Sequence, residues 1–246
     1  MFRKLFLLAL AVMALPAVTP ARAASVDEII AKHFEAQGGV DKIKAIKSWR
    51  FTGKMTLGQG MEAPFTMERV RPAKTRLEFS FSGMTGIRAF DGKSGWQVMP
   101  FMGSKDPEPF TAEENADAIE DSDFDGPLMD WKAKGHTVEL VGTEPVEGAD
   151  AYKLKVTRKS GKVEYFYLDT ETYLTVKQEA TRKMRGTDVE GESFLSDYKE
   201  VNGILVPYTM SQGMKGSDHR QTMTFDKVEA NVDVPEADFV MPAAAA

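Results

Sequence analysis

The chain has 246 residues, of which 31 are basic and 37 acidic, for a formal charge of −6, and it contains no cysteine. The acidic balance argues against binding to nucleic acid and against general adhesion to anionic membranes. The lack of cysteine excludes disulfides, thiolate metal sites and the lipid-attachment residue of a lipoprotein.

Residues 1–23 have the pattern of an export signal. Arg3 and Lys4 form a basic start, an apolar core follows over residues 5–15, and Ala21-Arg22-Ala23 is a small-x-small cleavage site. The apolar run is shorter than the ~20 residues that a helix needs to span a bilayer. We therefore expect cleavage of this signal after residue 23 and residence of the mature protein in the periplasm.

Residues 24–242 are expected to form a single domain. The stretch is long enough for one sizeable core, and no Pro-, Gly- or Ser-rich linker divides it. The alanines at 243–246 are interpreted as a disordered tail.

A helix is predicted at the start of this domain. Ser25 and Glu28 have the spacing of a capping box, and Gly38-Gly39 supplies a stop signal. One apolar stripe with a 3.6-residue repeat lies between them: Val26, Ile29, Ile30, His33 and Phe34.

Apolar and polar side chains alternate with a two-residue period from Trp49 almost to the end of the chain. Phe51 and Met55, for example, alternate with Thr52 and Lys54. Successive side chains on a strand point to opposite faces, so the pattern predicts an antiparallel sheet with one apolar face. Turn signals at regular spacing separate about ten or eleven strands, which favours a sandwich, a barrel or a half-barrel.

Residues 107–134 interrupt the alternation. This stretch has strong helix formers, several acids and only sparse apolar residues, and we interpret it as two short helices inserted in the sheet. With the N-terminal helix, it is the only helical material available to cover the apolar face. An incompletely filled interior is therefore consistent with the sequence.

The chain offers no convincing metal or catalytic motif. Asp121 to Gly126 resembles the first half of a calcium-binding loop, but the twelfth position is Lys132 instead of the required Glu. His33, His136 and His219 are scattered and form no zinc-binding spacing. We expect no bound metal, no cofactor and no enzymatic activity.

Methionine and phenylalanine are abundant, at 14 and 15 residues, and several of them fall on the predicted apolar face. Methionine is flexible and polarizable, which suits a surface that must fit variable apolar partners. The same residues would equally fill the core of a closed sandwich. From the alternation alone, both interpretations stay open.

Three hairpin-like stretches occur in order along the chain, at residues 90–96, 165–174 and 197–207, with the sequences FDGKSGW, YFYLDTETYL and DYKEVNGILVP. Each alone is only a turn signature with a strand attached. Together, their order and spacing resemble the periplasmic lipoprotein-carrier superfamily, the Lol-type proteins of outer-membrane lipoprotein sorting. The resemblance covers most of the chain after residue 23.

The resemblance implies a mainly β (α+β) fold, an unclosed antiparallel half-barrel with an N-terminal helix and inserted short helices as a plug or lid. It implies a non-enzymatic periplasmic carrier that shields the acyl chains of a lipoprotein or another lipid during transfer between membranes. We expect this carrier to be a monomer. A membrane-bound donor or acceptor protein would then be a partner. The alternative is an interaction or envelope-assembly module with a filled core.

Candidate binding residues follow from the alternation. The predicted lining of the cavity is Trp49, Phe51, Met55, Phe65, Met67, Leu77, Phe79, Phe81 and Phe166. The predicted lid residues are Phe124, Leu128, Met129 and Trp131.

Overall fold

A single antiparallel sheet dominates the fold. The computed structural model describes residues 24–57, 60–184 and 187–243. Within them, thirteen strands pair in the order β6-β5-β4-β3-β2-β1-β13-β12-β11-β10-β9-β8-β7. The strands are β1 (Ser48–Leu57), β2 (Met61–Val70), β3 (Lys74–Phe81), β4 (Met84–Phe90), β5 (Gly95–Met99), β6 (Ser104–Pro109), β7 (Thr137–Val146), β8 (Ala149–Thr157), β9 (Val163–Asp169), β10 (Thr175–Met184), β11 (Thr187–Val201), β12 (Ile204–Met214) and β13 (Arg220–Ala230).

Few helices accompany the sheet in the described part of the chain. They are α1 (Val26–Ala36), α2 (Val40–Ala45), α3 (Ala112–Asp121) and the short 3-10 helices η2 (Pro100–Met102) and η3 (Glu236–Phe239). The predicted mainly β architecture is therefore confirmed. The sheet has more strands than predicted because β5 is short and β6, with the sequence SKDPEP, lacks apolar alternation.

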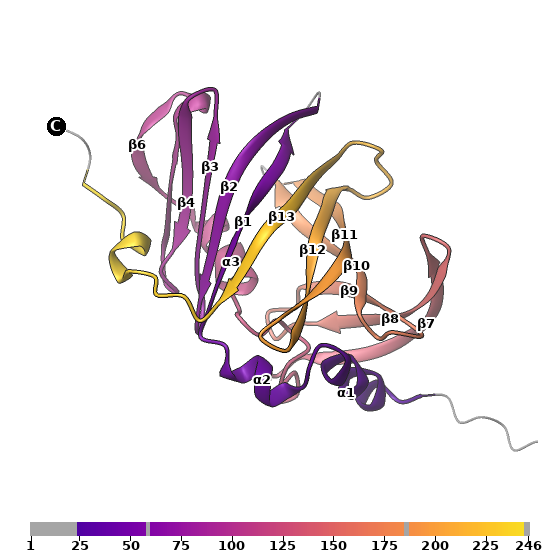
Figure 1. The fold of residues 1–246 in the computed structure, drawn as a ribbon. Coiled ribbons are helices and arrows are strands. Elements are labelled where there is room, and N and C mark those ends of the chain that lie inside the picture. The colour runs from indigo at the N-terminus through magenta and orange to yellow at the C-terminus, as the bar shows by residue number, and fades with distance from the viewer. Residues whose placement is uncertain (1–23, 58–59, 185–186, 244–246) are drawn as a thin grey trace, which may run out of the picture.

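The sheet bends into an unclosed half-barrel. Figure 1 shows β1 to β6 on one side and β7 to β12 on the other, with β13 leading from one side to the other and α1 and α2 below. The strands β6 and β7 end the strand order and stay unpaired with each other. The half-barrel predicted from the resemblance is confirmed.

One face of the sheet, here called the inner face, carries the apolar series. Partners across neighbouring strands share a face, and Phe51 pairs with Met67, which in turn pairs with Leu77. Leu77 pairs with Arg88, whose guanidinium reaches Glu114 of α3. The helix α3 therefore lies on the inner side of the half-barrel.

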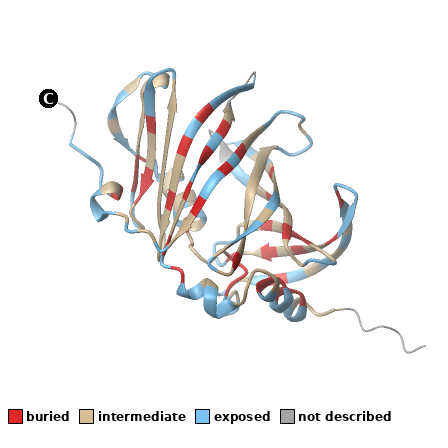
Figure 2. Ribbon diagram, in the orientation of Figure 1, coloured by how far each residue is buried: buried red, intermediate tan, exposed pale blue. Residues whose placement is uncertain are grey.

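The inner face contains two apolar clusters. One centres on β7 to β9 and α1, and includes Leu154, which is fully buried, and Phe166. The other centres on β1, β2 and β13, and includes Phe51 and Phe225. Figure 2 shows buried residues on both sides of the half-barrel accordingly. The interior is thus packed at two places and not as one continuous core.

The N-terminal helix forms as predicted. Ser25 accepts a hydrogen bond from the Glu28 amide, and the Glu28 carboxylate accepts one from the Ser25 amide, which completes the capping box. Four of the five stripe residues are buried: Ile29, Ile30, His33 and Phe34. Burial of this stripe fixes α1 against the end of the sheet.

The segment between β6 and β7 differs from the prediction. It contains one α-helix, α3, and residues 124–135 form successive turns instead of a second helix. Pro127 lacks the amide hydrogen that a helix requires, and Gly126 and Asp130 have positive φ angles. A helix cannot continue through such backbone, so the prediction of two inserted helices is wrong.

The segment after β13 covers part of the outer face. Phe239 of η3 is buried, and its carbonyl accepts a hydrogen bond of 2.9 Å from the Trp96 indole. Trp96 pairs with Ala89. The next residue on the strand, Gln97, lies on the inner face, so the Trp96 side chain lies on the outer face. The end of the chain therefore adds a second layer over β3 to β5, so the predicted tail begins only after this segment.

Both free edges of the sheet carry features that hinder further strand pairing. The edge strand β6 contains Pro107 and Pro109, which have no amide hydrogen. The other edge strand, β7, has a register shift between Leu140 and Gly142. Edges of this kind are poor templates for an added strand.

The export signal at 1–23 and most of the tail, at 244–246, lie outside the described residues. Across the described ranges, no helix combines the length and apolar character needed to cross a membrane.

Candidate functional site

A cavity of about 710 Å³ opens on the inner face of the half-barrel. One wall is the inner face of β9 to β13, and the opposite wall is the end of α3 with the loop that follows it, residues 120–128. His33 and Phe34 of α1, with Gln37 just after the helix, close one end. The volume lies within the ~300–1,000 Å³ that is usual for small-ligand sites.

The predicted lining residues are divided between this cavity and the surface beside it. Phe166 lines the cavity. The other eight lie on β1 to β3, on the inner face, but outside the cavity wall: Trp49, Phe51, Met55, Phe65, Met67, Leu77, Phe79 and Phe81. Five of these eight are only half-buried and form a partly exposed apolar surface beside the cavity: Trp49, Met67, Leu77, Phe79 and Phe81.

The predicted lid residues are divided in the same way. Phe124 and Leu128 line the cavity, and Arg71 lies over the Phe124 ring at 4.4 Å from its centroid. Leu128 and Met129 are buried in the cluster that contains α1, and Trp131 packs against that cluster. The loop after α3 is therefore anchored to the core at Leu128 and Met129.

The helix α3 itself has no buried residue. Its apolar side chain Ile119 is 55% exposed. Thr111 and Glu114 form a capping box that starts the helix, and Asn115 accepts a hydrogen bond from the Gly95 amide of β5. Apolar packing therefore contributes little to its position.

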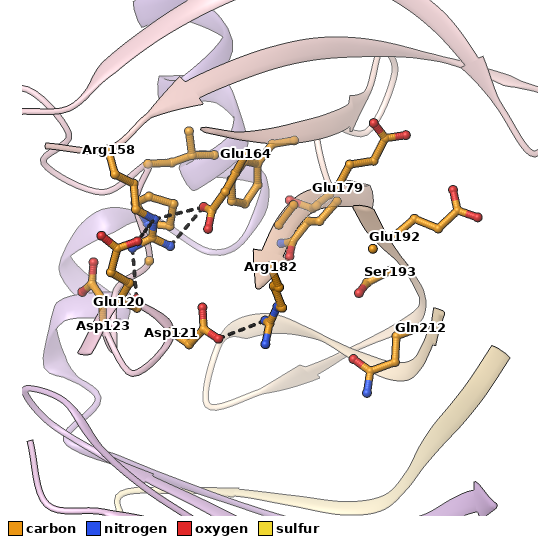
Figure 3. A pocket seen from close by; sticks show the side chains of 18 of the residues that line it. Glu120, Asp121, Asp123, Arg158, Glu164, Glu179, Arg182, Glu192, Ser193 and Gln212 are labelled. Carbon is orange, nitrogen blue, oxygen red and sulfur yellow. Dashed lines mark hydrogen bonds and ion pairs between the residues drawn. The ribbon is translucent and has the colours of Figure 1, made fainter. Parts of the chain in front are cut away.

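Charged contacts hold the C-terminal end of α3 to strand β10 and to the turn between β8 and β9. Asp121 pairs with Arg182 at 2.9 Å (Figure 3). Lys162 lies within 3.4 Å of the same carboxylate. The Arg158 guanidinium donates to the Glu120 carbonyl at 3.0 Å and pairs with Glu164 at 3.0 Å. Arg88 on β4 pairs with the other end of the helix, so α3 connects the two sides of the half-barrel through charges.

Arg69 contributes a further contact from the opposite side. It lies on β2, lines the cavity and donates to the carbonyl oxygens of Asp121 and Asp123 at 3.4 and 2.9 Å. Its Nε atom is buried without a hydrogen-bond partner. Burial lowers the pKa of this guanidinium, and the negative charges of Asp123, Asp121 and Asp125 oppose that shift.

The residues of the calcium-like loop are engaged by cations of the protein. Asp123 pairs with Lys134 at 2.6 Å, and Asp125 accepts two hydrogen bonds from Arg71 at 2.5 and 2.7 Å. These carboxylates therefore fix the loop beside the cavity.

His33 is buried at the end of the cavity. Its Nδ1 atom lies 2.8 Å from the Tyr173 carbonyl, so the neutral ring donates its hydrogen there. Burial lowers the pKa of His33 below its ordinary value, although the bond to the Tyr173 carbonyl acts in the other direction. A neutral imidazole here joins α1 to the turn between β9 and β10.

The inner face carries a cross-strand row of uncharged polar side chains, here called the polar row. Its members are Gln178, Ser193, Gln212 and Gln221, and each pairs in register with the next. All four line the cavity, and Ser193 and Gln212 are labelled in Figure 3. The row thus places amides and a hydroxyl along the floor of the cavity.

Two other acidic residues line the cavity with their main chain and not with their carboxylates. Glu179 and Glu192 alternate with Gln178 and Ser193, so their side chains lie on the outer face, and Figure 3 shows them pointing away from the cavity. Lys177 pairs with both, at 2.7 and 2.9 Å. Burial alone would raise the pKa of each carboxyl, but hydrogen bonds from Lys177 hold both pKa values below the ordinary range.

The polar members of the site were missed by the sequence reasoning, although a signal existed. Tyr208 and Met210 share the inner face with Gln212, and Met67 shares it with Arg69. The signal is a polar side chain at a position where the alternation requires an apolar one. Gln212 and Arg69 both occupy such positions. Arg158 carries no such signal because it lies in the turn after β8.

Comparison with solved structures places this architecture among the Lol-type half-barrels. A LolA superfamily protein from Nitrosomonas europaea is 13% identical, with 89% of this chain and 98% of that chain covered and a TM-score of 0.57. A putative outer membrane lipoprotein-sorting protein domain from Vibrio parahaemolyticus is 12% identical, with 85% and 94% covered and a TM-score of 0.57. At these identities the likeness shows the fold.

A DUF1329 family protein from Desulfovibrio piger has the same fold, at 16% identity and a TM-score of 0.60, with 87% of this chain and 97% of that chain covered. A family model whose description reads “-like: Uncharacterized protein” matches residues 89–243, and the chain belongs to that family. No curated protein matches the chain at a significant level. The resemblance to the Lol-type superfamily that the three hairpin stretches indicate is therefore confirmed at the level of the fold.

Proposed function

We propose that the protein is a non-enzymatic periplasmic carrier that shelters the acyl chains of a lipoprotein or another lipid during transfer between membranes. The observation that carries this proposal is the cavity of about 710 Å³ inside an open half-barrel, closed on one side by the end of α3, a helix with no buried residue, and by the loop that follows it. The alternative, an interaction module with a filled core, leaves this cavity without a role.

The apolar surfaces beside the cavity supply the affinity for hydrocarbon. Transfer of each methylene from water to an apolar surface gains about 0.8 kcal/mol. Half-buried Met67, Leu77 and Phe79 on one side, and Phe34 with Phe166 on the other, offer such surface. Even a modest length of acyl chain is then held while it crosses an aqueous compartment.

The helix α3 is the proposed lid. A lid that is held by polar contacts can open without exposing core residues, because none of its side chains is buried. Its anchor is the buried pair Leu128 and Met129, so the loop stays attached while the helix moves. Uptake and release would both use this movement.

Analysis of bound lipid tests the proposal most directly. Protein purified from its native periplasm is extracted with organic solvent, and the extract is analysed by mass spectrometry. An acyl lipid present in proportion to the protein is the expected result. Absence of lipid, together with failure of fluorescent fatty-acyl probes to bind, would exclude the carrier function.

A pair of neighbouring substitutions links the lipid to the cavity. Ala180 lines the cavity, whereas Thr181 is exposed on the opposite face of the same strand. Ala180→Phe places a ring in the cavity and should abolish co-purification of lipid. Thr181→Phe adds the same ring outside and should retain the lipid. Equal retention by both variants would show that the lipid lies elsewhere.

A further inference from the structure

The polar row is unusual for a cavity that holds only hydrocarbon. Gln212 donates to Gln221 at 3.1 Å, and Gln221 in turn reaches the Met55 sulfur at 3.8 Å. The side chains of Gln178 and Ser193 make no hydrogen bond to any other described residue, and both line the cavity. Half of the row is therefore available to a ligand.

A purely apolar ligand would be penalised at this row. Replacing water by hydrocarbon over the Gln178 amide and the Ser193 hydroxyl would leave donors and acceptors unpaired. Each such group costs about 1–3 kcal/mol when it is buried without a partner. A ligand that fits the row must return hydrogen bonds to it.

The charges around the cavity favour an uncharged ligand group. Arg158 and Arg182, which line the cavity, are already paired with Glu164 and Asp121. Arg69 donates to carbonyl oxygens, with carboxylates of the α3 loop nearby. Two of these guanidiniums are thus neutralised by carboxylates and the third is directed at the α3 loop, whereas the amides and the hydroxyl of the polar row match a neutral carbonyl group.

The row lies between the two apolar clusters. Gln178 pairs in register with Phe166 of the cluster around α1, and Gln221 reaches Met55 of the cluster around β1. A linkage bound at the row therefore has apolar surface on either side, which suits the junction between an acyl chain and its head group.

We propose that Gln178 and Ser193 bind the uncharged ester or amide linkage of an acylated ligand, so that the cargo is a neutral acyl ester or acyl amide and not a free fatty acid. This inference rests on the proposed carrier function and narrows its cargo. The amide hydrogens of Gln178 donate to the ligand carbonyl, and the Ser193 hydroxyl supplies a second donor or accepts from an amide hydrogen.

Competition against a neutral fluorescent reporter, N-phenyl-1-naphthylamine, tests the inference with the purified protein. The competitors share one acyl chain: monomyristoylglycerol is a neutral ester and myristate is an anion, both kept below their aggregation concentrations. The neutral ester should displace the reporter at about a tenfold lower concentration, equivalent to 1.4 kcal/mol. Equal potency, or stronger binding of myristate, overturns the inference.

The variant Gln178→Met with Ser193→Ala should weaken binding of the ester relative to myristate and so reduce the preference for the ester several-fold. The matched control is Ser211→Ala, because Ser211 adjoins Gln212 on the same strand but lies on the outer face, where it contacts Thr222. A preference that survives in the double variant refutes the role of the row. Failure of the reporter to bind the unaltered protein would instead refute the carrier function itself, and the inference with it.

Discussion

The lid helix should respond to salt. In the Arg88–Glu114 pair the two side chains are 40% and 29% exposed. In the Arg182–Asp121 pair they are 56% and 32% exposed. Pairs this exposed contribute about 0.2–1 kcal/mol each. Lys162, whose side chain is 15% exposed, forms a third ion pair with the helix, again through Asp121. Together these contacts favour the closed position by about 1–3 kcal/mol, with no apolar burial to support it.

Salt at about 1 M shortens the screening length to ~3 Å and should remove a large share of this energy. We expect the protection of the α3 amides against hydrogen exchange to fall about tenfold between low salt and 1 M NaCl, which corresponds to about 1.4 kcal/mol. The helix α1 is the internal control, because its buried Ile29, Ile30 and Phe34 make its position insensitive to screening.

A charge substitution gives the same test at constant salt. Arg182→Gln removes the pair with Asp121 and should lower the protection of α3. Lys199→Gln removes another exposed pair, with Asp197 on the same strand β11, and should leave α3 unchanged. The electrostatic account of the lid would be refuted if the hydrogen-exchange protection of α3 changed neither with salt nor in Arg182→Gln. It would also be refuted if the protection of α1 fell together with the protection of α3.

Three further outcomes follow from individual side chains. Arg69→Met removes the donor to the carbonyls of the α3 loop and should speed release of a bound acyl probe several-fold in stopped-flow measurements. Lys177→Met leaves Glu179 and Glu192 with fewer partners and should lower the free energy of unfolding by about 2 kcal/mol in urea at pH 7. The depressed pKa values of these carboxyls give stability that is present above their unfolded pKa and lost as the pH falls through the folded pKa, so the cost should shrink in acid. The pKa of His33 is lowered in the folded protein, so the unfolded chain binds the proton first and the native protein loses stability as the pH falls. His33→Asn removes this titration and should flatten the pH dependence of stability below about pH 6.5.

Each of these outcomes has a clear opposite. Unchanged release from Arg69→Met would remove that residue from the lid contacts, and a constant cost of Lys177→Met at every pH would show that packing and not charge sets its effect. Parallel stability curves for His33→Asn and the unaltered protein would mean that this ring does not titrate between the two states.

The fold was accessible from the sequence because its signals are local and periodic. The capping box at Ser25 and the alternation around Phe51 each depend on residues that are near one another in the chain. The prediction of a second helix after α3 came from the helix-forming composition of residues 107–134, and composition does not show where the backbone turns. The positive φ angles at Gly126 and Asp130 show that the chain turns there.

The site was only partly accessible because it is assembled across strands. Alternation places Phe166, Met67 and Gln212 on one face, but it does not say which part of a curved face lies under α3. That position depends on partners such as Arg158 and Arg182, which come from a turn and from an exposed strand position. Contacts between separate turns and strands have no periodic signature.

The two edge strands have a consequence for contacts between copies of the protein. A sheet that never closes keeps two rows of main-chain donors and acceptors that could recruit a strand from any unfolded neighbour. The prolines of β6 remove donors from one row, and the irregular register of β7 disrupts the other. Both features oppose pairing between the edges of two copies, so replacing Pro107 and Pro109 with valine should promote edge-to-edge association.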